Sequence, residues 1–234
     1  MKLQRFFGDF NLNEKILTVN DAGFYNQIKN VLRLSAGDRL ILCDGKNNEA
    51  EAEVDSISKD GIKLKIGKVA TNENEAEIKT VLYCAILKRE NFELVIQKAT
   101  EIGVKRIVPV ITARTVKLAI NTARLKAIAK EAAEQSGRGI VPEISKPMSF
   151  EDARKDAKTN SVNYFFDISG KSLMSFKNHF DTAGIFIGPE GGWEGDEIKI
   201  ARDQGYNFVS LGSLTLRAET AAIVASYSLI NSNK

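Results

Sequence analysis

A short segment, residues 184–197, constrains the fold of this chain more than any other stretch. It starts with an apolar, uncharged run that is typical of a buried strand. Gly188 and Pro189 end that strand, because proline fixes its own φ and restricts the residue before it. At Gly191 and Gly192 the backbone can take positive φ, and an acidic helix start comes next. The segment therefore predicts a strand, a tight turn and a helix in succession.

The chemistry of this turn limits its ligand. Turns of this kind often hold phosphate, but this one lacks a Gly-x-Gly-x-x-Gly pattern and a neighbouring Lys-Ser/Thr pair. Four carboxylates lie within eight residues, at Glu190, Glu194, Asp196 and Glu197. An acidic turn with an open backbone suits a neutral or cationic ligand. The same pattern also fits a tight turn that binds nothing.

The composition indicates a globular protein. At 234 residues, 43% of them hydrophobic, the chain can form one large domain or two smaller ones. No apolar run approaches the roughly 20 residues of a membrane helix, and the first residues lack the apolar core of a signal peptide. We expect a cytoplasmic protein without a membrane partner.

The chain is poor in metal ligands and catalytic histidines. Cys43 and Cys84 are the only cysteines, which gives neither a disulfide framework nor the spacing of a metal site. His179 is the only histidine, so the sequence argues against a zinc site and a Ser-His-Asp triad. Unpaired cysteines fit a reducing cytoplasm, and we expect no metal.

Positive charge is concentrated in the middle of the chain. The net charge is only +3, yet residues 79–138 contain 12 Lys and Arg against 5 Asp and Glu. A basic stretch in a nearly neutral protein suggests a face that binds a polyanion such as nucleic acid. Lysines on ordinary solvated helix surfaces would give the same count.

The first part of the sequence predicts a small β domain. Residues 1–70 show period-two alternation at 49–54 and 62–66, and a short helix is expected at 24–32. Several short strands at this spacing favour a small barrel. Residues 71–78 are polar and acidic with almost nothing to bury, so we place a linker there.

From residue 79 to 234, predicted strands alternate with predicted helices. The expected strands are at 80–87, 106–111, 162–168, 185–188 and 208–211, and the expected helices are at 91–102, 122–136, 195–204 and 217–230. This alternation predicts an α/β domain with a mostly parallel sheet and helices on both faces.

A second strand-turn-helix segment, residues 209–221, repeats the arrangement of the first. Because parallel strands end at one edge of their sheet, the two turns can face one pocket. Main-chain groups of the turns could then hold a flat heterocycle, with Leu211, Leu214 and Leu216 as apolar walls.

The two turns, in this order, resemble a known family. The Gly-Pro-Glu-Gly-Gly turn at residues 188–192, followed by residues 211–221, is similar to the RsmE family of SPOUT-class RNA methyltransferases, which methylate N3 of a uridine in 16S ribosomal RNA. Further similar segments occur in the family's order through both domains, at residues 5–7, 31–38, 88–104 and 131–142. Each segment alone is common, but their joint order is specific.

The resemblance implies a fold, a cofactor and partners. It implies an N-terminal PUA-like β-barrel for RNA, a C-terminal SPOUT domain with a trefoil knot, and a homodimer that acts on 16S rRNA in the 30S subunit. It also implies S-adenosylmethionine as cofactor, whose sulfonium and ammonium groups suit the acidic first turn. The residues expected to bind this cofactor are Ile187, Gly188, Glu190, Gly191, Gly192, Leu211, Gly212, Leu214, Leu216, Thr220 and Ala221.

The sequence departs from the family pattern at three places near these turns. Trp193 stands where the family usually has Phe, Leu214 where an arginine is often found, and Ala218 where a threonine precedes Glu219. Cofactor contacts made by the backbone should survive these changes.

Methyl transfer to uracil N3 requires that the N3 proton leaves, because the lone pair there belongs to the imide. Arg217 and Glu219 are the candidate catalytic residues, at the start of the last helix beside the second turn. Arg217 would position or stabilise the uracil carbonyls, and Glu219 would orient Arg217 or polarise N3–H. Glu219 also fits a carboxylate that only complements the helix dipole.

RNA contacts are expected from four arginines, at Arg5, Arg33, Arg114 and Arg138. Loop positions after strands and helices are typical of phosphate contacts. Each of these arginines fits a surface salt bridge equally well. Two further functions stay open: a SPOUT methyltransferase with another target, such as a tRNA ribose 2′-hydroxyl, and a non-catalytic RNA-binding factor in ribosome assembly.

Overall fold

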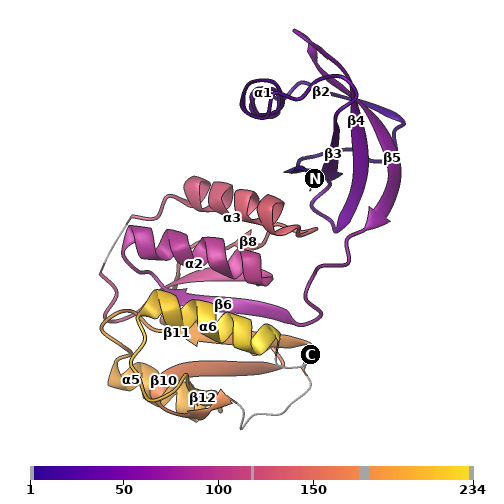
Figure 1. The fold of residues 1–234 in the computed structure, drawn as a ribbon. Helices are drawn as coiled ribbons and strands as arrows, with labels where there is room; N and C mark the ends of the chain where they lie inside the picture. Colours follow the sequence, from indigo (N-terminus) through magenta and orange to yellow (C-terminus); the bar gives the residue numbers. More distant parts are fainter. Residues whose placement is uncertain (1–2, 117–118, 174–179, 232–234) are drawn as a thin grey trace. The chain divides into compact units, whose positions relative to one another are not determined.

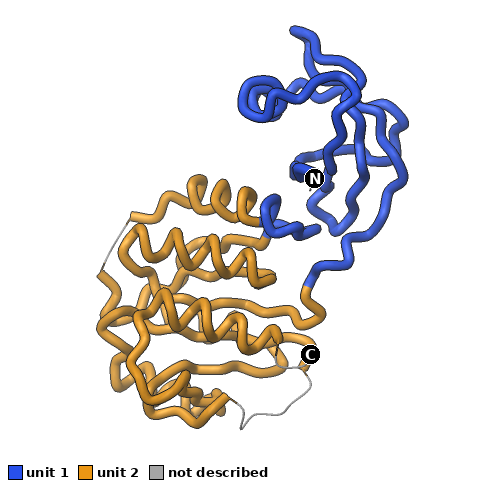
Figure 2. The backbone as a smooth tube through the Cα atoms, viewed as in Figure 1, with its two compact units in different colours: residues 1–75, 133–141 blue, residues 76–132, 142–234 orange. Residues whose placement is uncertain are grey.

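A computed structural model describes residues 3–116, 119–173 and 180–231 of the chain (Figure 1). The chain divides into two compact units (Figure 2). The first comprises residues 1–75 and 133–141, and the second comprises residues 76–132 and 142–234. A segment from the middle of the sequence therefore belongs to the N-terminal unit.

The first unit contains a five-stranded sheet. Its strands, in spatial order, are β1 (Arg5–Phe7), β3 (Arg39–Cys43), β4 (Asn48–Ser58), β5 (Gly61–Thr71) and β2 (Ile16–Val19). Neighbouring strands are antiparallel, except that β1 and β3 are parallel. In β4, Ala50, Ala52 and Val54 are buried while Glu51 and Glu53 are exposed. This confirms the period-two pattern predicted from the sequence.

The helix expected at residues 24–32 is present but irregular. α1 (Ala22–Asn26) begins after Asp21, whose carboxylate accepts a hydrogen bond from the Phe24 amide at 2.7 Å. The next turn, η1 (Gln27–Val31), is π-helical. Apolar periodicity over so few residues does not separate an α turn from a π turn, so the sequence could not predict this change.

Residues 133–141 are held in the first unit by a buried ion pair. Arg138 is 3% exposed, and its Nη2 and Nε donate to the two oxygens of Glu75 at 2.8 and 3.1 Å. Glu75 Oε1 also accepts hydrogen bonds from the amides of Gly139 and Ile140 at 3.1 and 3.2 Å. The carboxylate thus fixes both the guanidinium and the backbone of this segment.

All strand pairs in the sheet of the second unit are parallel. The spatial order is β12 (Asn207–Ser210), β10 (Val162–Ser172), β11 (Thr182–Ile187), β6 (Lys79–Ala85), β7 (Arg106–Ile111) and β8 (Glu143–Ile144), with β9 (Met148–Ser149) also paired to β7. Leu82 and Tyr83 are successive residues of β6 and both are fully buried, so both faces of the sheet are covered. The predicted α/β class is confirmed.

Helices cover this sheet. α2 (Arg89–Ile102) packs beside α6 (Ala218–Ile230), and α6 also lies against β6 and β11. α4 (Phe150–Asp156), with the short 3₁₀ turn η2 (Ala157–Thr159), and α5 (Gly195–Asp203) pack on an aromatic cluster that includes Tyr83, Phe165 and Phe186. α3 (Thr122–Ser136) starts in the second unit and ends in the first. Among the helices in the described residues, none is long and apolar enough to cross a membrane.

The position of α6 brings the segment that precedes it close to the end of β11. The chain leaves β12 at one edge of the sheet, and α6 then returns to the central strands β6 and β11. The trefoil knot stays a prediction from the family resemblance. The return brings the segment before α6 back toward the end of β11.

Some elements were not anticipated from the sequence. β8, β9 and α4 lie in residues 143–156, for which no element was expected. Strands of two residues and a helix of seven are too short to show a period. The start of α2 was also expected too late. That helix was predicted to start at residue 91, but it starts at Arg89, with Lys88 at the cap position and no side-chain cap.

Replacing Arg138 with Ala should destabilise the first unit. The substitution leaves the buried Glu75 carboxylate without its guanidinium partner, and we expect a loss of about 3 kcal/mol in unfolding free energy. Urea unfolding followed by far-UV circular dichroism measures this loss. Arg39→Ala is the matched control, because Arg39 pairs with Glu51 on the surface and its loss should change stability far less. Equal stability of the two variants would contradict a structural role for Arg138.

Candidate active site

A cavity of about 990 Å³ opens at the carboxyl ends of the parallel strands in the second unit. Its walls come from the residues after β6, from the middle of β10, and from the turns after β11 and β12. Parallel strands place these segments at one edge of the sheet. The expectation that the two glycine turns face one pocket is therefore confirmed.

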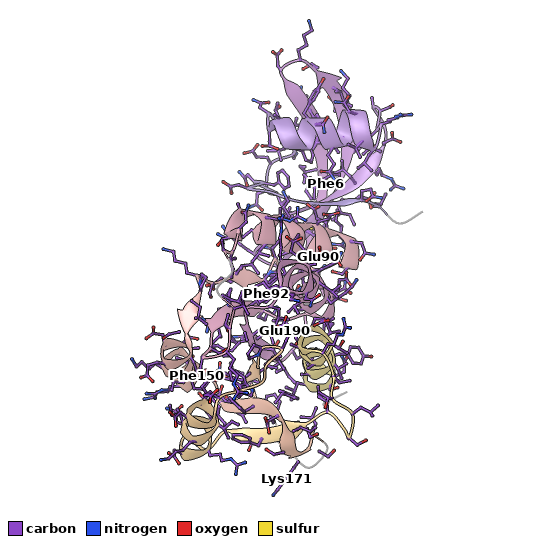
Figure 3. All side chains as sticks on the ribbon, turned by 90° about the vertical axis from the view of Figure 1, so that its left-hand side faces the viewer. Phe6, Glu90, Phe92, Phe150, Lys171 and Glu190 are labelled. Atoms are coloured by element: carbon purple, nitrogen blue, oxygen red, sulfur yellow. The ribbon has the colours of Figure 1, made fainter. Side chains whose placement is uncertain are left out.

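Nearly all the residues expected to bind a cofactor line this cavity. They are Ile187, Gly188, Glu190, Gly191, Gly192, Leu211, Gly212, Leu214, Leu216 and Ala221. Thr220 is the exception, since it is exposed on α6 and does not line the cavity. Figure 3 shows Glu190 on the first turn and Phe150 in the aromatic cluster of the same unit.

The Trp193 side chain packs between the first turn and the core of the second unit. Its indole is 5% exposed, and Nε1 donates a hydrogen bond to the carbonyl oxygen of Phe166 at 3.1 Å. The indole centroid lies 4.4 Å from the ring of Phe165 and 5.6 Å from that of Phe150. A Cβ added to Gly188 would lie 3.0 Å from the indole. A side chain at position 188 would therefore press on the indole of Trp193 and force it to shift.

Two glycines shape the turns through their backbone conformation. Gly192 has a φ of 71° and Gly212 a φ of 122°, in the region that only glycine adopts freely. The amide of Gly192 donates to the carbonyl of Pro189 at 2.9 Å, which closes the first turn. Of the two glycines at which the sequence allowed positive φ, Gly191 and Gly192, only Gly192 takes it.

Glu219 places an unpaired carboxylate in the cavity wall. The residue is 7% exposed, and within the described chain its buried Oε2 has no hydrogen-bond partner. It lies in the first turn of α6, where the helix dipole offers partial positive charge. A buried carboxylate without a partner is costly, so this wall of the cavity favours a cationic or proton-donating ligand.

Acidic groups also influence a thiol at the end of β6. Burial raises the pKa of Cys84, and the carboxylates of Glu190 and Glu219 raise it further. Cys84 is thus a neutral, buried thiol. Both carboxylates therefore lie close enough to the end of this central strand to disfavour a thiolate there.

Arg217 lines the same cavity from the cap position of α6 and is exposed. In the described part of the chain, no ion pair joins Arg217 to Glu219, so the suggestion that Glu219 orients Arg217 finds no contact here. The two side chains border one space and can act on one ligand separately.

The four arginines expected to contact RNA have different surroundings. Arg138 is buried against Glu75, and Arg5 donates to both oxygens of Glu49 at 2.5 and 3.1 Å. Arg33 is exposed and has a φ of 56°, an uncommon conformation for a residue other than glycine. Arg114 lines the cavity and pairs with Glu194. Arg33 and Arg114 are thus the two of these arginines with exposed side chains.

Other cavity residues were missed by the sequence analysis. They include Ile86, Leu87, Lys88, Asn91, Val116, Phe166, Asp167 and Ile168. The first three follow β6, so the same argument about parallel strand ends could have found them. Phe166, Asp167 and Ile168 lie within β10, where its pairing with β11 ends. His179 lies outside the described residues. Within the residues that the structure covers, no three His, Cys, Asp or Glu side chains gather as a metal site requires.

Comparisons with known proteins agree with this architecture. A family model described as an RNA methyltransferase domain matches residues 74–230, and one described as an RNA methyltransferase PUA domain matches residues 27–67. The chain is 32% identical to ribosomal RNA small subunit methyltransferase E of Rickettsia conorii over 96% of its own length and 94% of the relative's. The corresponding Bacillus subtilis protein is 31% identical over 86% of this chain and 84% of the relative.

Solved structures show the same fold over the whole chain. Ribosomal RNA small subunit methyltransferase E from Neisseria gonorrhoeae, bound to S-adenosylmethionine, has a TM-score of 0.89 and 29% identity and covers 97% of each chain. The methyltransferase Lpg2936 of Legionella pneumophila, in complex with S-adenosylmethionine, has a TM-score of 0.89 and 28% identity. It covers 100% of this chain and 98% of the Legionella chain.

Gly188→Ala should disturb the packing of Trp193. The new methyl group would press on the indole, and we expect a loss of about 1–3 kcal/mol in stability. Because Trp193 is the only tryptophan, its emission should also shift to longer wavelength as the ring becomes less buried. Gly195→Ala is the control, since nothing lies within 4 Å of a Cβ added at that glycine. Unchanged emission in Gly188→Ala would contradict this role.

Proposed function

The chain belongs to the RsmE family, the ribosomal RNA small subunit methyltransferases E, and on that basis we propose that it methylates N3 of a uridine in 16S rRNA with S-adenosylmethionine as methyl donor. The observation that carries the proposal is the cavity in which two glycine turns and the unpaired carboxylate of Glu219 meet. Two structures of similar fold contain S-adenosylmethionine.

The residues of the cavity fit this cofactor. Its volume of about 990 Å³ lies at the upper end for sites that bind small molecules and leaves room for a base beside the cofactor. The turns at Gly188–Gly192 and Leu211–Leu216 expose backbone groups that suit an adenosine moiety. Bound there, S-adenosylmethionine supplies an electrophilic methyl group on a sulfonium.

Glu219 and Arg217 have separate roles in this proposal. The Glu219 carboxylate accepts a hydrogen bond from uracil N3–H and so draws the proton away from the nitrogen. The Arg217 guanidinium donates to a uracil carbonyl and stabilises the negative charge that grows on the ring. A uridine in folded RNA reaches these groups only when it is turned out of its stack.

The RNA substrate would contact both units. The first unit matches the PUA domain model in its central part, and Arg33 presents an exposed guanidinium there. We propose the 30S subunit as the physiological partner and the cytoplasm as the compartment. Both cysteines are buried thiols that form no disulfide, which is compatible with that setting.

The deciding experiment offers three substrates. The protein is incubated with 30S subunits, naked 16S rRNA or tRNA, each with labelled S-adenosylmethionine, and nucleosides are identified by mass. We expect 3-methyluridine from the 30S subunit. A ribose-methylated product would favour the alternative target, and RNA binding without any methylated nucleoside would favour an assembly factor.

Arg217→Ala should abolish most methyl transfer without preventing cofactor binding. Loss of a donor that stabilises developing charge lowers kcat by about 10²–10³-fold. Binding of S-adenosylmethionine, followed by Trp193 fluorescence, should change little because the turns remain intact. Glu219→Gln should likewise lower kcat while the protein stays folded. Unchanged turnover in either variant would end the assignment of that residue.

We also propose that the protein is a homodimer formed through α2 and α6. α6 is apolar on nearly every side, although only part of its surface contacts the sheet and α2. Val224 and Tyr227 are one turn apart on α6 and are 37% and 60% exposed, and Leu94 on α2 is 39% exposed. A helix that is apolar all round is normally covered, and a second copy of this surface would cover it.

Tyr227→Glu should convert the dimer into a monomer. A charge at the centre of an apolar interface would remain unpaired on both copies of the chain. Size-exclusion chromatography with light scattering measures the mass, expected near 25.8 kDa for the variant and twice that for the wild type. Ile16→Glu, at an exposed apolar residue of the first unit, is the control and should leave the mass unchanged.

A further inference from the structure

Arg114, in the loop after β7, contacts the first glycine turn through its guanidinium. Nη1 donates a hydrogen bond to the carbonyl oxygen of Gly191 at 2.8 Å. Nε donates to Oε2 of Glu194 at 2.5 Å, just before α5. The side chain also lies along the turn, because Cδ and Cβ of Arg114 are 3.5 and 3.6 Å from the place of a Cβ on Gly191.

The neighbouring residue of the same loop makes a parallel connection. The amide of Ala113 donates to Oε1 of Glu197 at 3.0 Å, and Oε2 of Glu197 accepts from the amide of Glu194 at 2.9 Å. Glu197 is 7% exposed, so these bonds are largely shielded from water. Residues 113 and 114 thus hold both the turn and the start of α5.

The loop itself is fixed where it leaves the sheet. The amide of Thr112 donates to Oγ1 of Thr115 at 3.0 Å, and the two hydroxyl oxygens are 2.7 Å apart. Thr112 is 5% exposed. The backbone that carries Arg114 is therefore fixed. Its guanidinium is held against the turn and does not extend freely into solvent.

These contacts matter for binding more than for folding. The Arg114–Glu194 pair is about half exposed on both sides, so it adds little to the stability of the fold. Gly191 lines the cavity and has no side chain that could hold its backbone in place, so its carbonyl is positioned by the hydrogen bond from Arg114. A site that recognises its ligand through main-chain groups binds well only when those groups are fixed beforehand.

We propose that Arg114 is a positioning residue for the methyl donor: it fixes the Gly191 carbonyl and the Glu194 side chain so that the first turn is shaped to receive S-adenosylmethionine. This rests on the proposed function. In this role the Arg114 guanidinium is engaged with the first turn. As a phosphate contact, the same guanidinium would have to be available to RNA.

The test compares cofactor binding with RNA binding in Arg114→Ala. In the full chain, the dissociation constant for S-adenosylmethionine is measured by calorimetry and by Trp193 fluorescence. We expect it to rise about tenfold, with the melting temperature of the free protein nearly unchanged. The KM for S-adenosylmethionine should rise in parallel, while kcat at saturating cofactor and the salt dependence of RNA binding stay close to wild type.

Three further variants separate positioning from charge. Arg114→Lys keeps the charge, but a single ammonium does not reproduce the two-point contact, so binding should be intermediate. Glu194→Gln removes the ion pair and keeps the Gly191 contact, so it should weaken S-adenosylmethionine binding less than Arg114→Ala does. In the double variant the two losses of binding free energy should not add fully. Arg154→Ala is the matched control, because Arg154 pairs with Glu151 at the same Nε distance of 2.5 Å outside the cavity.

Two results would overturn the inference. Wild-type affinity for S-adenosylmethionine in Arg114→Ala would show that the contacts do not shape the turn. Weaker RNA binding with a salt slope reduced by about one, and no change in cofactor affinity, would identify Arg114 as a phosphate contact. If the wild-type protein itself does not bind S-adenosylmethionine, the proposed function fails, and this inference fails with it.

Discussion

The packing of the Trp193 indole beneath Gly188 is the contact on which the cavity depends. The indole sits on the aromatic cluster between the sheet and helices α4 and α5, and its Nε1–H donates a hydrogen bond to the Phe166 carbonyl in the middle of β10. The turn above β11 is therefore tied to the neighbouring strand and to the core. Because a Cβ at Gly188 would meet the indole at 3.0 Å, the backbone of the turn packs tightly against the ring at this position.

The electrostatics of the site follow from the same arrangement. Glycine turns beside helix starts usually favour anions, since unpaired amides and the helix dipole are positive there. Here Glu190 and Glu219 add negative charge to the cavity wall, beside the basic residues Lys88, Arg114 and Arg217. A sulfonium cofactor and an imide proton suit such a cavity, whereas a phosphate group does not.

Arginine has several distinct roles in this protein. Arg138 is a buried structural residue whose partner Glu75 also binds backbone amides. Arg114 bridges a loop and a turn, and Arg217 borders the cavity without an ion pair to Glu219. In the sequence these residues differ little, because each follows a strand, a helix or a turn. Their roles are set by which carboxylate or carbonyl lies within reach.

The sequence by itself determined two kinds of feature: strands with a periodic or continuous apolar pattern, and the glycine turns that end them. The alternation in β4 and β5, the apolar strand of β11 and both glycine turns follow from local burial and backbone freedom, so the cavity between the turns was predictable. Only the tertiary structure decided that residues 133–141 join the N-terminal unit and that the two-residue strands β8 and β9 pair with β7. It also decided which carboxylate or carbonyl each arginine contacts. The physical reason is that charge pairing and short strand pairing depend on neighbours distant in sequence, which leave no periodic signal in the chain.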